Sequence, residues 1–370
     1  MQFQKAHLPD YKLIVLLAVI VVFGLVMLSS VGAVIAYQKF GDSYFFVKKQ
    51  FLLGIFPGIV LAFIFSKIPY HTWRKIAFPL LVISILLLVS VFIPGLGSTH
   101  NTRSHSWLLI AGFSLQPSEI VKLTFLMYLA SWLEQRGERG VKDFSYGFLP
   151  FLVVLGVIMF LMILQPDIGT MAIIVLIALS VYYVAGAHLK HLVILGLGGL
   201  GLFALLIKIA PYRLARFTIF LNPELDPQGI GYHINQAFLA IGSGGFFGRG
   251  FGQSRQKFNY LPEITGDSIF AVIAEELGFF LTIMVVALFV AFAYKGFKIA
   301  LSSPDTFGKL LAVGITSWIV FQSFINIGAM VGLMPITGVP LPFISYGGTA
   351  MTMNLAAMGI LINISKYSKT

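Results

Sequence analysis

The chain contains no cysteine and few charged residues. Of its 370 residues, 11% are Asp, Glu, Lys or Arg, whereas 58% are hydrophobic. The absence of cysteine excludes disulfide bonds, thiolate metal sites and a cysteine nucleophile. A soluble domain has about 25% charged residues. The low charge and the mean hydropathy of +0.92 therefore predict a protein that crosses the membrane several times.

Several patterns of known chemistry are also absent from the sequence. There is no Walker A pattern for nucleotide phosphates, no HExxH zinc motif and no GxSxG nucleophile elbow. The seven histidines are scattered along the chain. Nucleotide-driven, zinc-dependent and serine-hydrolase chemistry therefore lack their usual residues, and the carboxylates are the main candidates for chemistry.

The formal net charge is +11, which in a soluble protein would suggest a nucleic-acid partner. Here the Lys and Arg residues lie in short segments between apolar runs, where they act as orientation signals and contacts for anionic lipid. We therefore expect no nucleic-acid partner. The first apolar run is long enough to span and no small-residue cleavage site follows it, so we expect no cleaved signal peptide.

Ten apolar runs predict ten transmembrane helices, since a bilayer-crossing helix needs about 20 mostly apolar residues. The expected fold is an all-α polytopic membrane protein, with one domain over residues 1–370 and a large extracytoplasmic loop, about 208–267, between helices seven and eight. The predicted spans are 13–37, 44–66, 76–95, 115–133, 147–164, 168–187, 190–207, 268–294, 308–333 and 341–364.

Ten spans place both termini on the same side of the membrane. The short loops on that side carry most of the Lys and Arg residues, and the positive-inside rule assigns such loops to the cytoplasm. The short loops on the opposite side carry only Lys39, Lys48, Lys49 and Arg103. We therefore expect a multi-pass protein of the cytoplasmic membrane with both termini in the cytoplasm.

The polar motifs all fall on the predicted outer side. Each has a structural alternative, because proline is tolerated in a first helical turn and glycines serve turns as well as phosphate cradles. A site on this side has no ATP or nucleotide sugar available, so an activated substrate must carry its own leaving group. The motifs are QPSE at 116–119, QPDIGT at 165–170, NPELDPQGIGYH at 222–233, GSGGFFGRGFG at 242–252, LPEITGDS at 261–268 and PLPFISYGG at 340–348.

Two groups of charged residues lie inside predicted spans, where a charge is costly unless it is paired. Glu119 and Lys122 are three residues apart and share a helix face, so they can pair, either to lock the bundle or as part of a site. Glu275 and Glu276 are adjacent and point about 100° apart on a helix. We interpret this second pair as structural or lining residues.

The sequence allows three kinds of partner for Glu275 and Glu276. These are Lys122, an amide such as Gln322 or Asn326, and a backbone donor.

Two aspartates precede predicted spans. Asp167 is expected to cap the N–H groups of the sixth span. Asp267 lies at the interface before the eighth span, where a carboxylate that is wet on one side and apolar on the other has its pKa raised towards the range of a general base. The alternative is that Asp267 or Ser268 caps that helix.

Taken together, the motifs resemble the SEDS family of FtsW, RodA and SpoVE, over nearly the whole chain. The resemblance implies a glycosyltransferase that polymerises lipid II into peptidoglycan with a class B penicillin-binding protein and other proteins of the division or elongation machinery. It rests on QPSE with a following Lys122, QPDIGT, NP-E-x-DP-x-G-x-GYH, AIGSGG-x-x-G-x-G, LPE with Asp267 four residues on, F-A-V-x-AEELG and P-x-PFISYGG.

Within the family, GFGQSRQKFNYLPE is more similar to FtsW, whereas GVPLPFISYGG contains the Gly-Val-Pro-Leu-Pro often seen in RodA; we favour an FtsW-like protein. Two departures concern the outer side. The family's Arg-Trp pair is Ser106-Trp107 here, with Arg103 displaced, and its Thr-Asp-Phe is replaced by Gly266, Asp267 and Ser268.

The resemblance implies that Asp267 is the catalytic base. Positive groups are then expected to bind the substrate pyrophosphate. The substrate-binding candidates are Lys122 held by Glu119, the arginines Arg103, Arg213, Arg216 and Arg249, and the polar residues Gln116 and Ser345.

We expect Glu263 to be a structural or lining residue, as we do Asp167, Glu275 and Glu276. No cofactor is certain, and a divalent cation stays open. Residues 212–221 are expected to form an amphipathic segment in the outer loop. The alternative functions are a lipid II flippase and a non-catalytic scaffold that recruits a penicillin-binding protein.

Overall fold

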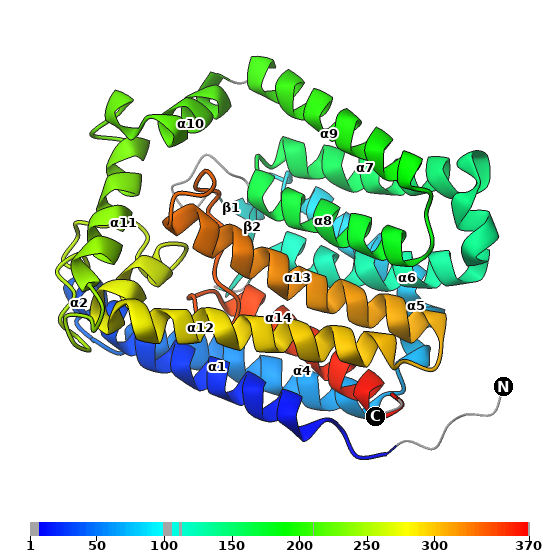
Figure 1. The fold of residues 1–370 in the computed structure, drawn as a ribbon, viewed down its shortest axis with the longest axis horizontal. Coiled ribbons are helices and arrows are strands. Elements are labelled where there is room, and N and C mark those ends of the chain that lie inside the picture. Colours follow the sequence, from blue (N-terminus) through cyan, green and yellow to red (C-terminus); the bar gives the residue numbers. More distant parts are fainter. Residues whose placement is uncertain (1–6, 99–105, 111–112, 210, 369–370) are drawn as a thin grey trace.

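The computed structural model describes residues 7–98, 106–110, 113–209 and 211–368. Long helices lie side by side, with the termini towards one end and α2 (Ala33–Phe40) and α11 (Ile230–Gly244) at the other (Figure 1). Seven helical runs in this part of the chain are long and apolar enough to cross a membrane: Tyr11–Val31, Phe45–Lys67, His71–Ser90, Phe144–Leu164, Ile269–Leu301, Thr306–Met330 and Gly348–Ser365.

The first helices follow the expected ranges with changed boundaries. Asp10 caps the first helix by accepting from the backbone N–H groups of Lys12 and Leu13, and this helix ends where the chain bends at Gly32 before α2. The second expected span contains a π-helical turn, η1, between two α-helices. The elements are α1 (Tyr11–Val31), α2, α3 (Phe45–Gln50), η1 (Phe51–Ile55), α4 (Phe56–Lys67) and α5 (His71–Ser90).

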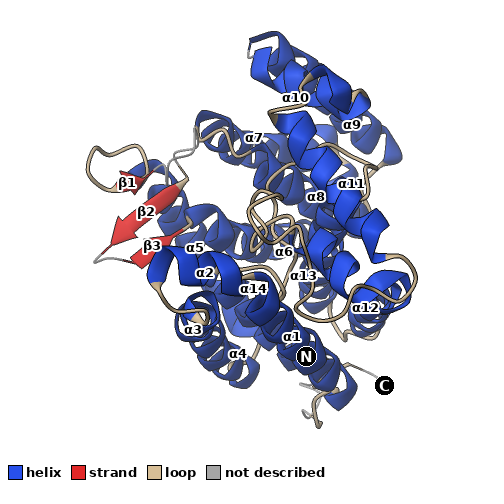
Figure 2. Cartoon of the chain, turned by 90° about the vertical axis from the view of Figure 1, so that its left-hand side faces the viewer, coloured by secondary structure: helices blue, strands red, loops and turns tan. Residues whose placement is uncertain are grey.

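A small antiparallel sheet follows α5, so the prediction of an all-α protein is incomplete. Its strands pair in the order β1 (Gly97–Ser98), β2 (Trp107–Ile110) and β3 (Phe113–Leu115). Figure 2 shows the strands at one edge of the helices. Strands this short carry too few residues for a visible alternation of polar and apolar side chains. The sheet leads directly into Gln116, so it fixes where the next helix begins.

The middle of the chain contains helices at the next four expected spans, and it also contains the expected long loop. α6 (Pro117–Lys142) continues beyond the predicted end of its span, past a break at Gly137. The long loop is largely helical, and the expected amphipathic segment is confirmed as a helix, α10. The remaining elements are η2 (Phe144–Phe148), α7 (Leu149–Leu164), α8 (Ile168–Val184), α9 (Leu189–Ile209), α10 (Pro211–Leu221), η3 (Pro223–Leu225) and α11.

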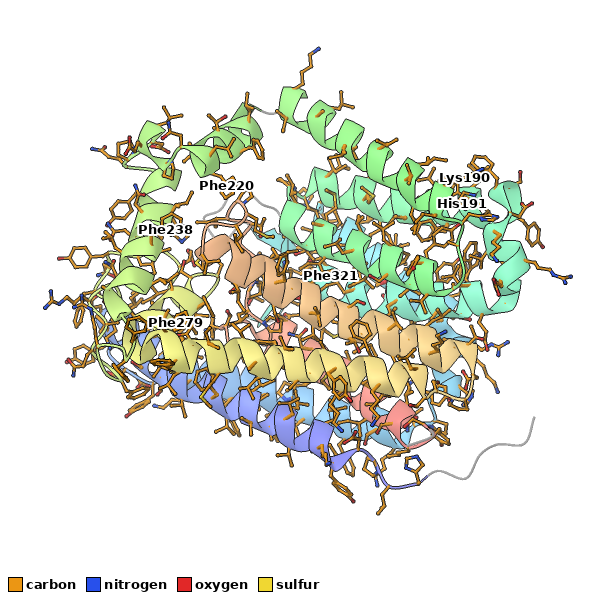
Figure 3. The ribbon with its side chains drawn as sticks, viewed as in Figure 1. Lys190, His191, Phe220, Phe238, Phe279 and Phe321 are labelled. Carbon is orange, nitrogen blue, oxygen red and sulfur yellow. The ribbon has the colours of Figure 1, made fainter. Side chains whose placement is uncertain are left out.

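The eighth expected span, 268–294, corresponds to α12 (Ile269–Leu301), which starts where expected, ends later and is broken internally at Gly278. That residue has φ 73° and ψ −178°, outside the helical region. The short segment 269–277 therefore takes a different direction from the long segment 279–301. Phe279 lies at the start of the long segment, beside the lower end of α11 (Figure 3).

The centre of the bundle is formed by α13 (Thr306–Met330) and α14 (Gly348–Ser365). Both are mostly buried, and Trp318 is among the largest fully buried side chains. Small residues let neighbouring helices approach closely, as is common in membrane bundles. A Cβ on Gly359 of α14 would lie 2.4 Å from the carbonyl oxygen of Ala62 on α4. The tenth expected span begins later than predicted, because residues 341–347 form a turn.

Candidate functional site

The turn that carries Asp267 is held by backbone and side-chain hydrogen bonds. The carbonyl oxygen of Glu263 accepts from the N–H groups of Gly266 (2.9 Å) and Ser268 (3.3 Å). The hydroxyl of Ser345 donates to the Gly266 carbonyl at 2.6 Å, and the N–H of Tyr346 donates to the Thr265 carbonyl at 2.8 Å. The PFISYGG motif therefore packs against this turn. Ser345 fixes the backbone next to Asp267.

The Asp267 side chain is 9% exposed, and its Oδ1 atom has no hydrogen-bond partner among the described residues. Burial, together with the nearby charge of Glu263, raises the pKa of the Asp267 carboxyl to about 7, although hydrogen bonds with Ser268 oppose the shift. Asp267 lies in the loop before α12. A carboxyl with this pKa can exchange protons near neutral pH.

The alternative role of Asp267 or Ser268 as a side-chain cap is not observed. Ser268 is the N-cap residue of α12 and makes no side-chain hydrogen bond to the first turn. Its hydroxyl instead lies 2.6 Å from Nε2 of His233 on α11. The helix α11 is thereby joined to the residue next to Asp267.

Two amide side chains on α13 connect this turn to the rest of the bundle. Asn326 donates from Nδ2 to the carbonyl oxygens of Asp267 and Val339, both at 2.8 Å. One helical turn away, Gln322 donates from Nε2 to the Pro340 carbonyl at 2.9 Å. Both amides thus bind the segment that precedes the PFISYGG turn, and neither contacts Glu275 or Glu276 through a described hydrogen bond.

Glu119 and Lys122 form the predicted ion pair, with 2.8 Å between Oε1 and Nζ. Their side chains are 3% and 1% exposed. Lys122 also donates to Oε1 of Gln322 at 3.0 Å and lies over the Trp318 ring, 4.6 Å from its centroid. A buried ammonium with a carboxylate, an amide and an aromatic face around it is well compensated.

Gln116 and Asp167 bring the QPSE and QPDIGT motifs together. Nε2 of Gln116 donates to Oδ2 of Asp167 at 3.2 Å. Oδ1 of Asp167 accepts from the N–H of Thr170 at 3.1 Å, which confirms that Asp167 caps its helix, α8.

Glu275 and Glu276, which the sequence predicted to be structural or lining residues, make structural contacts in the fold. Because the break at Gly278 follows directly, both carboxylates lie at the break and bind the glycine-rich segment 249–257. Glu275 accepts from the Ser254 hydroxyl (2.5 Å) and the Arg255 N–H (3.0 Å). Adjacent residues therefore serve one segment, although they point in different directions on the helix.

Glu276 completes this network at the C-terminal end of α1. It accepts from the Ser30 hydroxyl at 2.7 Å and pairs with Lys257 at 3.2 Å. Sequence reasoning missed Lys257 and Ser30 as partners. Lys257 lies in the quoted GQSRQK stretch, but its pairing depends on a chain reversal that the sequence pattern does not indicate.

The candidate arginines are distributed over different elements. Nε of Arg249 lies 3.5 Å from Oε1 of Glu275, so this arginine belongs to the network at the break. Arg213 and Arg216 belong to α10, and their side chains lie outside what the structure describes. Arg103 lies outside the described residues. Within the described part of the chain, no three His, Cys, Asp or Glu side chains gather as a metal site would require.

Comparison with known proteins gives consistent matches over nearly the full length. The family model for the cell cycle proteins FtsW, RodA and SpoVE matches residues 11–370. The chain is 44% identical over 366 residues to stage V sporulation protein E of Bacillus subtilis, covering 99% of both chains. It is 39% identical over 361 residues to the probable peptidoglycan glycosyltransferase FtsW of Trichlorobacter lovleyi, covering 97% of this chain and 94% of that one.

Solved structures share the fold. A chain from a study of the structural coordination of polymerization and crosslinking by a peptidoglycan synthase complex matches with a TM-score of 0.79 and 27% identity, covering 96% of this chain and 97% of that one. The rod shape determining protein RodA of Thermus thermophilus matches with a TM-score of 0.70 and 28% identity, covering 98% of each. With its fold, its motifs and its relatives in agreement, the chain belongs to the FtsW, RodA and SpoVE family of cell cycle proteins.

Proposed function

We propose that this protein is a peptidoglycan glycosyltransferase that polymerises lipid II on the outer face of the bacterial cytoplasmic membrane. The observation that carries the proposal is Asp267, a carboxyl with a raised pKa and a buried oxygen that has no hydrogen-bond partner among the described residues. Its turn is held by Ser345 of the PFISYGG motif and by Asn326 of α13. The names of the FtsW relatives support the same reaction class.

The proposed reaction uses one proton acceptor. The 4-hydroxyl of the acceptor sugar attacks C1 of the donor sugar, and Asp267 takes the hydroxyl proton as the new C1–O bond forms. The bond from C1 to the pyrophosphate oxygen breaks, and the undecaprenyl pyrophosphate leaves with the electron pair. A single displacement of this kind inverts the configuration at C1. A positioned general base contributes typically about 10²–10⁴-fold to such a rate.

The charge on the leaving pyrophosphate requires cationic groups. Lys122 is enclosed by Glu119, Gln322 and Trp318. We therefore propose that Lys122 holds α13 against α6 and does not contact phosphate. Arg103, Arg213 and Arg216 remain the proposed phosphate ligands, with or without a divalent cation. Arg249 is held by Glu275 and is a weaker candidate for this role.

The proposal includes the orientation in the membrane. With α6, α8 and α9 added to the seven long apolar runs, ten helices cross the bilayer, both termini are cytoplasmic, and the long loop with Asp267 is outside. A class B penicillin-binding protein is the expected partner, since the matched synthase complex is named for polymerization and crosslinking. The machinery it serves is that of division or elongation, and its sequence favours an FtsW-like role.

A lipid II flippase is the second candidate. A flippase needs a polar route through the bundle, whereas Glu119 and Lys122 neutralise each other inside it with very low exposure. This closed pair favours the glycosyltransferase.

The test is purification of the protein with its cognate penicillin-binding protein, followed by incubation with lipid II and separation of glycan chains on a gel. The wild-type complex should form chains, and the Asp267→Asn complex should form almost none. Inactivity of the wild-type complex together with transfer of lipid II across vesicle membranes would instead support the flippase.

A further inference from the structure

An exposed group of aromatic side chains surrounds the break at Gly278. We call it the outer aromatic cluster. It contains Phe246 and Phe247 from the glycine-rich loop, residues 245–257, which follows α11 and includes the segment 249–257, and Phe279 and Phe280 from the start of the long segment of α12. The ring of Phe246 lies 6.1 Å from that of Phe279, and the ring of Phe247 lies 5.7 Å from that of Phe280. All four side chains are exposed, and Phe247 is 85% exposed.

The backbone holds this cluster in place. The N–H of Phe279 donates to the Gly245 carbonyl at 2.9 Å, and the N–H of Arg249 donates to the Glu275 carbonyl at 2.9 Å. A Cβ on Gly278 would lie 2.1 Å from the Gly248 nitrogen, so the backbones of the loop and of α12 are in close contact at this point. The cluster is therefore a fixed projection rather than a group of loose loop side chains.

The length of the long segment of α12 indicates the depth of the cluster in the membrane. Residues 279–301 extend over roughly 33 Å at about 1.5 Å per residue, which is close to the ~30 Å hydrocarbon core of a bilayer. Lys295 and Lys298 lie near the other end of this segment, where long basic side chains reach the interface. Phe279 and Phe280 are thus placed at the outer boundary of the hydrocarbon.

The surroundings of the cluster change from apolar to polar across this boundary. On the membrane side, Leu281, Met284 and Val290 of the same segment are exposed, as expected for side chains that face lipid. On the other side, Arg249 pairs with the buried Glu275. An apolar aromatic surface below a charged pair fits the interface between lipid tails and headgroups.

From these observations we infer that the outer aromatic cluster inserts into the outer leaflet of the membrane and anchors the glycine-rich loop there. Its partner is the lipid surface, at the level where acyl chains meet headgroups. Because Glu275 and Glu276 join this loop to the segment 269–277, the anchor also fixes the depth of the short helix that begins two residues after Asp267.

The absence of cysteine in the chain makes a direct test simple. Single variants Phe247→Cys and Phe246→Cys carry a nitroxide label, and the full-length protein is placed in phosphatidylglycerol and phosphatidylethanolamine vesicles. Collision rates with oxygen and with a water-soluble nickel chelate then report depth. Val290→Cys on the same helix is the lipid-facing control, and Arg255→Cys in the same loop is the water-facing control.

The expected ratio of oxygen to nickel collisions at 246 and 247 lies between the ratios at 290 and 255. Nickel collisions at 246 and 247 as frequent as at 255 would overturn the inference. A second result would also overturn the inference. If the labels are exposed to water in vesicles of this protein alone and become protected from both reagents only when a penicillin-binding protein is added, the cluster is a protein-docking surface.

Discussion

Lys122 and Gln322 are joined by a hydrogen bond of 3.0 Å although they are 200 residues apart in the sequence. Gln322 in turn binds the Pro340 carbonyl, and Asn326 on the same helix binds Val339 and Asp267. A continuous set of polar contacts therefore leads from the buried ion pair on α6 to the proposed base.

Removing one partner of the buried ion pair should destabilise the protein strongly. Glu119→Gln and Lys122→Met each leave an uncompensated buried charge, which typically costs about 3–5 kcal/mol. The double variant should lose much less than the sum of the two, as thermal unfolding in detergent would show. The matched control is the exposed pair Glu138 and Lys142, whose removal should change stability by less than about 1 kcal/mol. Additive losses at the buried pair would mean that the two charges are compensated independently.

Asp267→Asn should abolish most glycan synthesis without unfolding the protein. The substitution keeps the size of the side chain but removes the proton acceptor, so the rate should fall by about 10²–10⁴-fold. Among the described contacts, no hydrogen bond joins Oδ1 of Asp267 to the first turn of α12, and Asn would also serve as a cap, so the thermal stability and insertion should be retained. A rate near that of wild type would move the search for the base to Glu119, Glu263 or Glu275.

The rate of polymerisation should rise with pH through about 7, the pKa of Asp267, because only the ionised carboxylate accepts a proton. Glu263→Gln removes a negative charge that raises this pKa, so the acid limb of the profile should move to lower pH. Glu263→Asp, which keeps the charge, is the control and should shift the limb less. If the pH–rate profile of Glu263→Gln is unchanged, the acid limb does not depend on the charge of Glu263 beside Asp267.

The same ionisation has a consequence for stability, with a defined sign. The folded protein holds the Asp267 proton more tightly than the unfolded chain, whose pKa is near the ordinary value of 3.8. The contribution of this carboxyl to the free energy of unfolding is therefore greatest at low pH. It falls as the pH rises from the ordinary pKa of 3.8 through about 7. Asp267→Asn should show a weaker fall of the melting temperature over this window.

Asn326→Ala should misplace the turn that carries Asp267. Two buried carbonyl oxygens, of Asp267 and Val339, would lose their donor, at about 1–3 kcal/mol for each group left unsatisfied. We expect a lower melting temperature and a lower kcat with a smaller change in KM. Ser323→Ala is the matched control, since that buried hydroxyl bonds only the Ile319 carbonyl of its own helix among the described contacts. Equal effects of the two variants would argue against a positioning role for Asn326.

The helices were largely predictable because runs of apolar residues report directly on the bilayer. The Glu119 and Lys122 pair and the Asp167 cap were also predictable, since both depend on residues three apart on one helix. The partners of Glu275, Glu276 and Asn326 were not, because they lie in distant segments brought together by the tertiary fold. The break at Gly278 was missed because a lone glycine in an apolar run has no distinct sequence signal.

The break at Gly278 divides α12 into two helical segments that meet at a single non-helical residue. A continuous helix transmits twist along its hydrogen-bond ladder, whereas a residue at φ 73° interrupts that ladder. The short segment 269–277 is therefore positioned by tertiary contacts at both of its ends. Glu275 and Glu276 bind the segment 249–257 at one end, and Asn326 binds the Asp267 carbonyl just before the other. The direction of the long segment and the position of Asp267 are thus set by separate contacts.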